Sequence, residues 1–294
     1  MRLTARVPAT VANLGPGFDV FGLALALHNE ITVDTGVEGS IAIDGEGSDE
    51  LPADDSNLVV RAMNRFAEVA EAPLPSFGLH SVNRIPLERG LGSSAAAVVG
   101  GLCLASRLLE RTLETESIVR IAAELEGHAD NVAAAVVGGL AIVYETDGGE
   151  RVERLQPAGV LRPVILIPDR ERISTRLARE VLARDVPRED ATFNASRAAL
   201  LTIALTSRPD LLEVALQDRL HQERRLELAP KARKLFAELV AAHVPVCVAG
   251  SGPTLLAFEI EERAVPDPGA GWRVLRIGID IEGAKVLEQG PSGG

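Results

Sequence analysis

Residues 86–96 read Pro86-Leu87-Glu88-Arg89-Gly90-Leu91-Gly92-Ser93-Ser94-Ala95-Ala96, a glycine- and serine-rich loop followed directly by an apolar stretch that ends at residue 109. The two glycines can adopt positive φ and let the backbone approach a ligand closely. The apolar stretch predicts a helix, whose free N–H groups and positive dipole end suit a phosphate group. The two serines add hydroxyls suited to phosphate or Mg²⁺. We therefore predict that residues 86–96 bind phosphate and lead into a helix over residues 95–109.

Two better-known phosphate-binding patterns do not fit this loop. It lacks the Gly-Lys-Ser/Thr sequence of a P-loop, and its glycine spacing differs from that of a dinucleotide-binding turn. A simpler interpretation is a glycine turn before a serine-capped helix. The loop taken alone leaves both interpretations open.

The composition favours a globular protein and argues against nucleic-acid binding. Of the 294 residues, 46% are hydrophobic and 24% are charged, which allows one large or two medium cores. The net charge of -12 and the aromatic content of 3% contrast with the basic, aromatic surfaces of nucleic-acid binders. Cys103 and Cys247 lack metal-ligand spacing. Neither a signal-peptide layout nor an apolar stretch long enough to span a membrane is present, so we expect a cytoplasmic protein without membrane partners.

Hydrophobic periodicity predicts a mixture of strands and helices. Strands are predicted over residues 2–7, 23–33, 77–85, 140–144, 164–167, 244–248, 254–260 and 273–279. Helices are predicted over residues 56–70 (with Ser56 as the cap), 95–109, 115–126, 175–182, 192–206, 210–218 and 230–243. The irregular order of strands and helices indicates an α+β fold rather than a doubly wound sheet. A charged, turn-rich stretch over residues 148–158 predicts a boundary between regions 1–155 and 156–294, and residues 289–294 are expected to form a flexible tail.

Three motifs in order along the chain resemble those of the GHMP kinases, the superfamily of galacto-, homoserine, mevalonate and phosphomevalonate kinases. They are the loop 86–96, the segment Val7-Pro8-Ala9-Thr10-Val11-Ala12-Asn13-Leu14-Gly15-Pro16-Gly17-Phe18-Asp19, and the turn Ala249-Gly250-Ser251-Gly252-Pro253-Thr254. The resemblance spans nearly the whole chain. It implies a two-domain GHMP kinase fold, with a ribosomal-S5-like N-terminal domain and a ferredoxin-like C-terminal domain. It also implies that residues 86–96 bind ATP and that the active site lies in the cleft between the domains.

The first motif most resembles its homoserine-kinase form, which implies L-homoserine as the substrate. An amino acid needs an anion to hold its ammonium group and guanidinium groups to hold its carboxylate. The resemblance places Asn13 and Asp19 beside the ammonium group. It places Thr175, Arg179 and Arg225 beside the carboxylate.

Two further segments resemble family motifs but depart from them. Residues 218–225, Asp-Arg-Leu-His-Gln-Glu-Arg-Arg, resemble the pattern D-R-x-H-x-P-Y-R, with Glu223 and Arg224 in place of Pro-Tyr. Arg224 therefore competes with Arg225 for the carboxylate. Residues 126–131, Glu-Gly-His-Ala-Asp-Asn, resemble E-G-H-P-D-N, with Ala129 in place of a rigid proline.

The resemblance also assigns catalytic roles. Glu126 is the implied Mg²⁺ ligand together with Ser94, and hard oxygen ligands suit that ion. His128 and Asn131 are implied near the carboxylate and hydroxyl of homoserine. We expect catalysis mainly by positioning, with Asn131, Asp19 and Glu126 as the catalytic groups. The alternative role for Asp19 is that of the general base.

Two other functions remain open. One is a GHMP kinase that acts on a different small alcohol, such as mevalonate. The other is a nucleotide-binding paralogue without turnover. The resemblance further implies a role in threonine biosynthesis and a homodimer.

Overall fold

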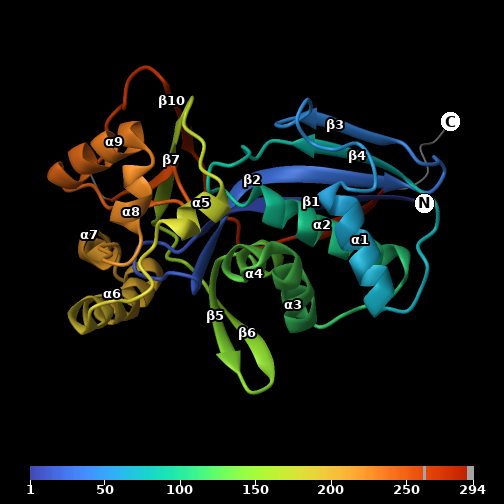
Figure 1. Ribbon diagram of the computed structural model, residues 1–294, viewed down its shortest axis with the longest axis horizontal. Helices are drawn as coiled ribbons and strands as arrows, with labels where there is room; N and C mark the ends of the chain where they lie inside the picture. The colour runs from blue at the N-terminus through green and yellow to red at the C-terminus, as the bar shows by residue number, and fades with distance from the viewer. Residues whose placement is uncertain (261–262, 290–294) are drawn as a thin grey trace.

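The chain builds two sheets, which lie side by side in Figure 1. The computed structural model describes residues 1–260 and 263–289. The first sheet has seven strands; its main path is β11-β1-β2-β4-β3, and β5 pairs with β2 and with β6. These strands are β1 (Arg2–Ala12), β2 (Phe21–Asp34), β3 (Ile41–Gly45), β4 (Gly78–Asn83), β5 (Leu140–Thr146), β6 (Gly149–Leu155) and β11 (Lys285–Gln289). β3 and β4 pair in parallel, and the other pairings of this sheet are antiparallel.

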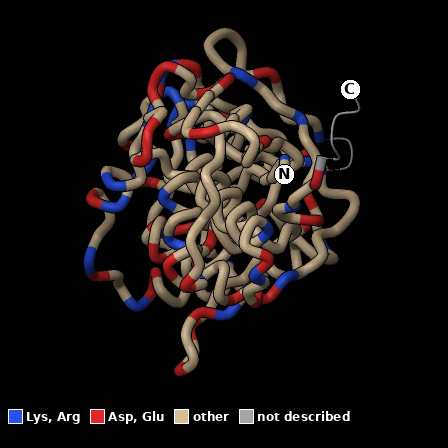
Figure 2. The backbone as a smooth tube through the Cα atoms, turned by 90° about the vertical axis from the view of Figure 1, so that its right-hand side faces the viewer, with Lys and Arg blue, Asp and Glu red and all other residues tan. Residues whose placement is uncertain are grey.

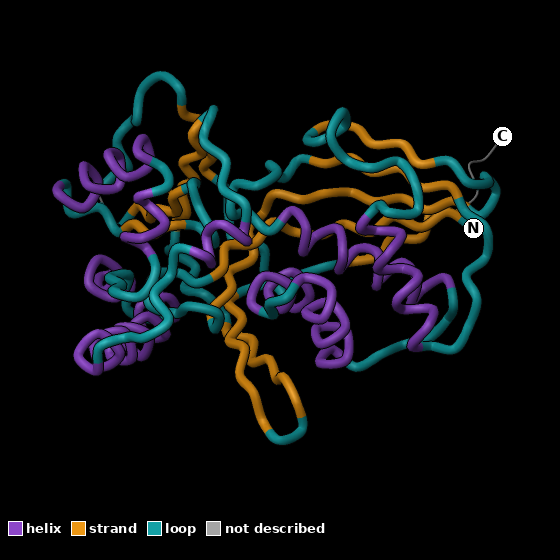
Figure 3. Tube along the Cα trace, in the orientation of Figure 1, coloured by secondary structure: helices purple, strands orange, loops and turns teal. Residues whose placement is uncertain are grey.

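Four helices cover one face of the first sheet (Figures 1 and 3). They are α1 (Leu58–Val69), α2 (Ser93–Leu108), α3 (Thr115–Glu126) and α4 (Asp130–Val137). α2 lies at the centre of this layer, where it contacts β1, α1 and α4, and nine of its residues are buried. Packing on several sides fixes α2 in place, so the loop 86–96 at its N-terminus has a rigid support.

The second sheet has four antiparallel strands in the order β10-β7-β9-β8. The strands are β7 (Arg162–Pro168), β8 (Val246–Val248), β9 (Leu255–Glu259) and β10 (Trp272–Arg276). The helices of this region are α5 (Thr175–Glu180), α6 (Arg188–Thr206), the 3₁₀ turn η1 (Pro209–Leu211), α7 (Leu212–Ala215), α8 (Gln222–Glu227) and α9 (Pro230–Ala241).

Both faces of β7 are buried, which explains its uninterrupted apolar run. Ile165 and Ile167 belong to the large core shared with the first sheet, whereas Val164 and Leu166 belong to a smaller core that includes residues of α9. Adjacent residues of a strand point to opposite faces, so one strand can serve two cores. The shared core joins the two regions of the chain.

The mixed, irregular order of strands and helices confirms the predicted α+β class. The last strand, β11, pairs with β1, so residues 285–289 return to the first sheet. The division into regions 1–155 and 156–294 stays a prediction. Of the predicted tail, Gln289 ends β11, and residues 290–294 lie outside the described residues.

The structure adds a strand that was not predicted and corrects one helix cap. Residues 149–155, within the charged stretch 148–158, form β6, which pairs with β5 in a hairpin that projects from the body of the molecule (Figure 3). The cap of α1 is Asn57 rather than Ser56, because the Asn57 side chain accepts a hydrogen bond from the backbone N–H of Val59 at 3.0 Å. Ser56 instead donates its hydroxyl to Asp54.

The surface and the helices carry two further observations. Acidic and basic residues alternate along the outer loops in the view of Figure 2, rather than forming a single basic band. Within residues 1–260 and 263–289, no helix is both long and apolar enough to cross a membrane.

Candidate active site

A cavity of about 570 Å³ brings together residues from both regions of the chain. The loop 86–94 forms one wall, and the β1–β2 loop, the start of α4 and the start of α5 form others. All three predicted motifs contribute residues to this cavity. It is therefore the candidate active site.

The glycines of the loop 86–96 occupy positions where a side chain would not fit. Gly90 has φ 70°, and a Cβ there would lie 1.9 Å from the carbonyl oxygen of Ala249. Gly92 has φ 69° and directly precedes α2, and a Cβ there would lie 2.0 Å from Thr10 Oγ1. Both positions need the left-handed region and a close approach, which glycine alone provides without strain. The contact with Ala249 also places the third motif directly behind the loop.

The side chain of Arg89 points away from the space where a phosphate would bind. Its guanidinium is buried and donates to the backbone carbonyls of Pro168, Asp169 and Glu171, at the end of β7 and just beyond. Burial lowers the pKa of Arg89. Only the backbone of this residue is therefore available to a nucleotide, while its side chain ties the loop to the second sheet.

Ser94 and Glu126 meet at the N-terminus of α2. The Ser94 hydroxyl donates to Glu126 Oε2 at 2.6 Å. Burial raises the pKa of Glu126, although the bond from Ser94 and the nearby His128 oppose that shift. A cation would relieve this burial penalty, so the pair fits a hard divalent ion. Among the described residues, no cluster of three or more His, Cys, Asp or Glu could hold a metal, so phosphate and water oxygens would complete the coordination.

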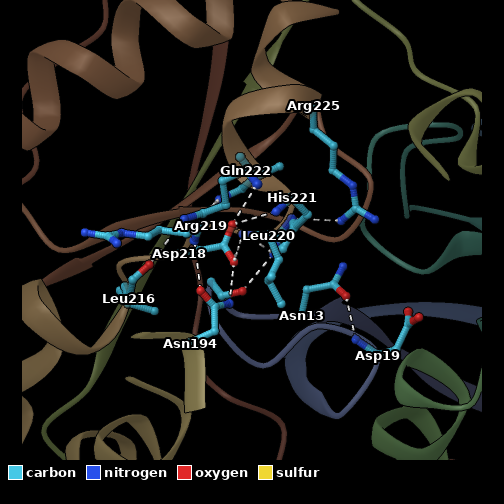
Figure 4. Close-up of polar contacts among 12 residues, drawn as sticks. Asn13, Asp19, Asn194, Leu216, Asp218, Arg219, Leu220, His221, Gln222 and Arg225 are labelled. Carbon is cyan, nitrogen blue, oxygen red and sulfur yellow. Dashed lines mark hydrogen bonds and ion pairs between the residues drawn. The ribbon is translucent and has the colours of Figure 1, made fainter. Parts of the chain in front are cut away.

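The β1–β2 loop presents Asp19 to the cavity (Figure 4). Asn13, with φ 71°, accepts a hydrogen bond from the backbone N–H of Asp19 at 3.0 Å and donates to the carbonyl of Gly250 at 3.2 Å. Both ends of the Asn13 amide are therefore used to shape the loop. Asn13 therefore lies beside Asp19 and orients it.

Asp19 forms a two-point ion pair with Arg179, near the end of α5. The two N···O distances are 2.8 and 3.1 Å, and both side chains are somewhat more than one third exposed. Thr175 lies in the first turn of the same helix and also lines the cavity. Ser174 caps α5 by accepting from the backbone N–H of Leu177 at 3.3 Å. The cap and the ion pair fix this wall of the site.

Arg225 occupies the second predicted guanidinium position, while Arg224 faces solvent. Arg225 is 3% exposed and lines the cavity, whereas the side chain of Arg224 is 57% exposed and lies 3.7 Å from Glu227. Burial lowers the pKa of Arg225 to about 10, so it remains a cation at neutral pH. Its Nε atom is buried without a hydrogen-bond partner among the described residues. This arrangement favours Arg225 over Arg224 as an anion ligand.

His128, Asp130 and Asn131 lie at the start of α4. His128 Nδ1 lies 3.2 Å from the buried Asp130 carboxylate. Burial works to lower the pKa of His128, but the carboxylates of Asp130 and Glu126 together outweigh it, and the net shift is upward. Asn131 accepts a hydrogen bond from the Thr10 hydroxyl at 2.8 Å. Thr10 thus lies between Asn131 and Gly92. This role was not predicted, although Thr10 is a hydroxyl residue within the first motif.

Five polar residues that line the cavity away from the three motifs were not predicted as site residues. These are Asn29, Ser56, Asn57, Ser81 and Asn83. They come from β2, β4 and the start of α1, and no short motif contains them. Asn29 holds the start of the phosphate loop by accepting from the backbone N–H groups of Arg84 and Ile85 at 2.8 and 3.0 Å.

Known proteins resemble the chain at three levels. Residues 57–139 match the family model of the GHMP kinases N-terminal domain. The chain is 40% identical to a homoserine kinase of Streptomyces avermitilis, with 96% of this chain and 94% of that protein covered. It is 42% identical to a homoserine kinase of Rhodococcus opacus (strain B4), with coverages of 98% and 94%. A crystal structure of homoserine kinase from Cytophaga hutchinsonii superposes with a TM-score of 0.82 and 26% identity, over 97% of each chain.

Proposed function

This chain belongs to the homoserine kinase family of the GHMP kinases, and from that premise we propose that it phosphorylates L-homoserine. The reaction transfers the γ-phosphate of ATP to the side-chain hydroxyl and gives O-phospho-L-homoserine and ADP. One observation carries the substrate assignment. A carboxylate, Asp19, and two guanidinium groups, Arg179 and Arg225, line the same cavity as the glycine-rich loop.

The charges in the cavity suit an α-amino acid. Its ammonium group pairs with Asp19, and its carboxylate pairs with Arg179 and Arg225. Charge-assisted hydrogen bonds are about twice as strong as neutral ones, and arginine can hold a carboxylate at two points. Mevalonate has no ammonium group and would leave Asp19 without a substrate partner, which argues for homoserine.

The nucleotide extends from the loop toward the part of the cavity lined by β2, β4 and the start of α1. The backbone N–H groups at the start of α2 bind the phosphates, and the dipole of that helix favours their negative charge. The polar residues near Asn57 and Asn83 offer hydrogen-bond partners for the base and ribose. Asn57 also caps the N-terminus of α1, so this helix fixes the position of a side chain that contacts the base.

Catalysis rests on positioning and on charge neutralisation. Ser94 and Glu126 would hold Mg²⁺, which when bound would neutralise phosphate charge. Asn131, fixed by Thr10 on one side of the loop, orients the homoserine hydroxyl. His128 lies beside it and contributes to the carboxylate site. Phosphoryl transfer needs little covalent help from the protein, so these fixed groups suffice.

Asp19 acts in binding rather than as the base. Its carboxylate already faces a guanidinium at two points, and the substrate ammonium takes the same place. The homoserine oxygen forms a bond to the γ-phosphorus while the bond from that phosphorus to the ADP oxygen breaks, and the hydroxyl proton passes to an oxygen of the transferred phosphate.

Turnover of a panel of alcohols tests the substrate assignment. ADP release with Mg·ATP is measured for L-homoserine, D-homoserine, L-threonine, L-serine, mevalonate and galactose. We expect kcat/KM for L-homoserine to exceed the others by at least about 100-fold, because ammonium, carboxylate and hydroxyl must all fit at once. Higher turnover of mevalonate or galactose would refute the substrate assignment.

Two further properties follow from the family alone. We propose a homodimer and a cytoplasmic location, as the resemblance implies. Light scattering coupled to gel filtration checks the first, with about twice the monomer mass expected. The mass of one chain, 31.1 kDa, would contradict the dimer.

A further inference from the structure

A buried histidine connects the two charged sides of the substrate site (Figure 4). His221, the residue before α8, is 1% exposed. Its Nε2 lies 2.7 Å from the carbonyl oxygen of Gly15, in the loop that carries Asp19. Its Nδ1 lies 3.1 Å from a guanidinium nitrogen of Arg225. His221 has no direct role in the proposed phosphoryl transfer.

The two partners determine the proton position on the ring. A carbonyl oxygen only accepts, so Nε2 must carry the hydrogen, and a guanidinium only donates, so Nδ1 must be unprotonated. The imidazole is therefore neutral, with its proton on Nε2. Burial lowers the pKa of His221 to about 4, which agrees with a neutral ring. A charged ring would oppose the cation of Arg225.

The backbone that carries His221 is fixed by Asp218. This buried carboxylate accepts from the backbone N–H groups of His221 and Gln222 at 2.9 and 2.8 Å. The side chain of Asn194, on α6, donates to it at 2.7 Å. Asp218 thus anchors the turn before α8 to another helix, so the ring has little freedom to move.

Arg225 has few other constraints. The same nitrogen that contacts His221 donates to the carbonyl of Gly250 at 2.6 Å, and the Phe18 ring lies 5.3 Å from the guanidinium carbon. The Phe18 ring also lies 5.4 Å from the ring of His221. His221 therefore supplies the side-chain acceptor that sets how far Arg225 extends into the cavity.

We propose that His221 is a positioning residue, which sets how far the carboxylate-binding Arg225 extends into the cavity. The inference rests on the proposed function for the identity of the substrate. The contact between His221 and Arg225 is independent of the substrate and follows from the geometry alone. Neutral imidazole is the one side chain here that donates to Gly15 and accepts from Arg225 at the same time.

Two matched variants separate these contacts. His221→Asn can place its carbonyl oxygen near the position of Nδ1 and keep an acceptor for Arg225. His221→Gln can place its amide nitrogen near the position of Nε2 and keep the donor to Gly15. We expect His221→Gln to raise the KM for L-homoserine about tenfold, the effect of losing one hydrogen bond to a charged group. We expect His221→Asn to raise it less than threefold, and the KM for ATP to change less than twofold in both.

The comparison also excludes a purely structural role. A loss of folding alone would change the KM values for ATP and L-homoserine together, or affect both variants equally. Either result would overturn the inference, as would an unchanged KM for L-homoserine in His221→Gln.

The protonation state of His221 can also be tested on the unmodified protein, without a variant and without turnover. Nitrogen-15 NMR of the imidazole rings reports the tautomer of His221 between pH 6 and 8. The Nε2–H neutral form supports the inference, and a charged ring or the Nδ1–H form overturns it. If the expected tautomer is found but L-homoserine is not turned over, the proposed substrate fails while the hold of His221 on Arg225 stands.

Discussion

Asp19 and Arg179 lie 160 residues apart in the sequence and form a two-point ion pair across the candidate active site, with distances of 2.8 and 3.1 Å. In this pair the carboxylate and the guanidinium neutralise each other. An amino acid carries both charges, so its ammonium group can replace Arg179 beside Asp19, and its carboxylate can replace Asp19 beside Arg179. A substrate with a single charge would leave one member of the pair without a partner, and that penalty accounts for selectivity toward zwitterions.

Replacing Arg179 tests this exchange. We expect Arg179→Ala to raise the KM for L-homoserine by about 10- to 100-fold, the effect of losing a charged hydrogen bond, with a smaller change in kcat. Arg176→Ala is the matched control, because Arg176 lies on the same helix with an 81% exposed side chain that pairs with Glu180. Steady-state kinetics decide, and equal effects of the two variants would contradict the assignment.

Asp19→Asn separates binding from proton transfer. Because Asp19 is assigned to the substrate ammonium, we expect a KM for L-homoserine raised about tenfold or more and a kcat that changes less. The KM for ATP serves as the internal control and should stay constant. An unchanged KM for L-homoserine together with a large loss of kcat would make Asp19 the general base.

The neighbouring arginines of α8 give a second matched pair. Arg225→Ala should raise the KM for L-homoserine by about 10-fold or more, because it removes a buried guanidinium from the cavity. Arg224→Ala removes an exposed guanidinium and should leave the kinetics within about twofold. A larger effect of Arg224→Ala would show that the carboxylate binds elsewhere.

Glu126→Gln should make the folded protein more stable and the enzyme less active. The pKa of Glu126 is raised in the folded state, so folded protein binds more protons than unfolded protein as pH rises above about 4.5, and stability falls over that range. Removing the charge should raise Tm at pH 7 without Mg²⁺ by about 1–3 °C, and the gain should vanish below about pH 4. Activity should fall by about 100-fold or more. A lower Tm at pH 7 would contradict the burial penalty.

Much of the site could be predicted because short motifs encode it. Residues 86–94 of the loop line the cavity together with His128, Asp130 and Asn131 of the segment 126–131, whereas Ala95, Ala96 and Glu126 do not line it. α3 spans Thr115–Glu126, the predicted bounds. In these segments local chemistry decides the structure. Glycine permits positive φ, and the apolar stripe of a helix has a regular period.

Other features depend on contacts between distant segments. β6 has the sequence Gly-Glu-Arg-Val-Glu-Arg-Leu, whose charged residues resemble a loop, and only its pairing with β5 makes it a strand. β11 is a five-residue edge strand that pairs with β1, in a register that runs from Arg2 with Gln289 to Arg6 with Lys285. The direction of Arg89 depends on the carbonyl groups at the end of β7. A local sequence pattern cannot indicate which distant segment a strand or a side chain will contact.

Gly90→Ala tests the contact between the loop and the third motif. The added Cβ would lie 1.9 Å from the carbonyl oxygen of Ala249, at φ 70°. Gly39→Ala is the control, because Gly39 has φ 63° with nothing within 4 Å of an added Cβ, so it carries the backbone strain alone. That strain costs about 1–2 kcal/mol. We expect Gly90→Ala to lower Tm at least about twice as much and to raise the KM for ATP; thermal melts showing equal losses would contradict the close contact.

The identity of the phosphorylated atom tests the central claim most directly. Phosphorus-31 NMR of a reaction with Mg·ATP and L-homoserine reports where the phosphate is attached. The account predicts a phosphomonoester coupled to the two protons of the homoserine hydroxymethyl carbon, formed in equal amount to ADP. Inorganic phosphate alone, or an acyl phosphate on the carboxylate, would contradict it.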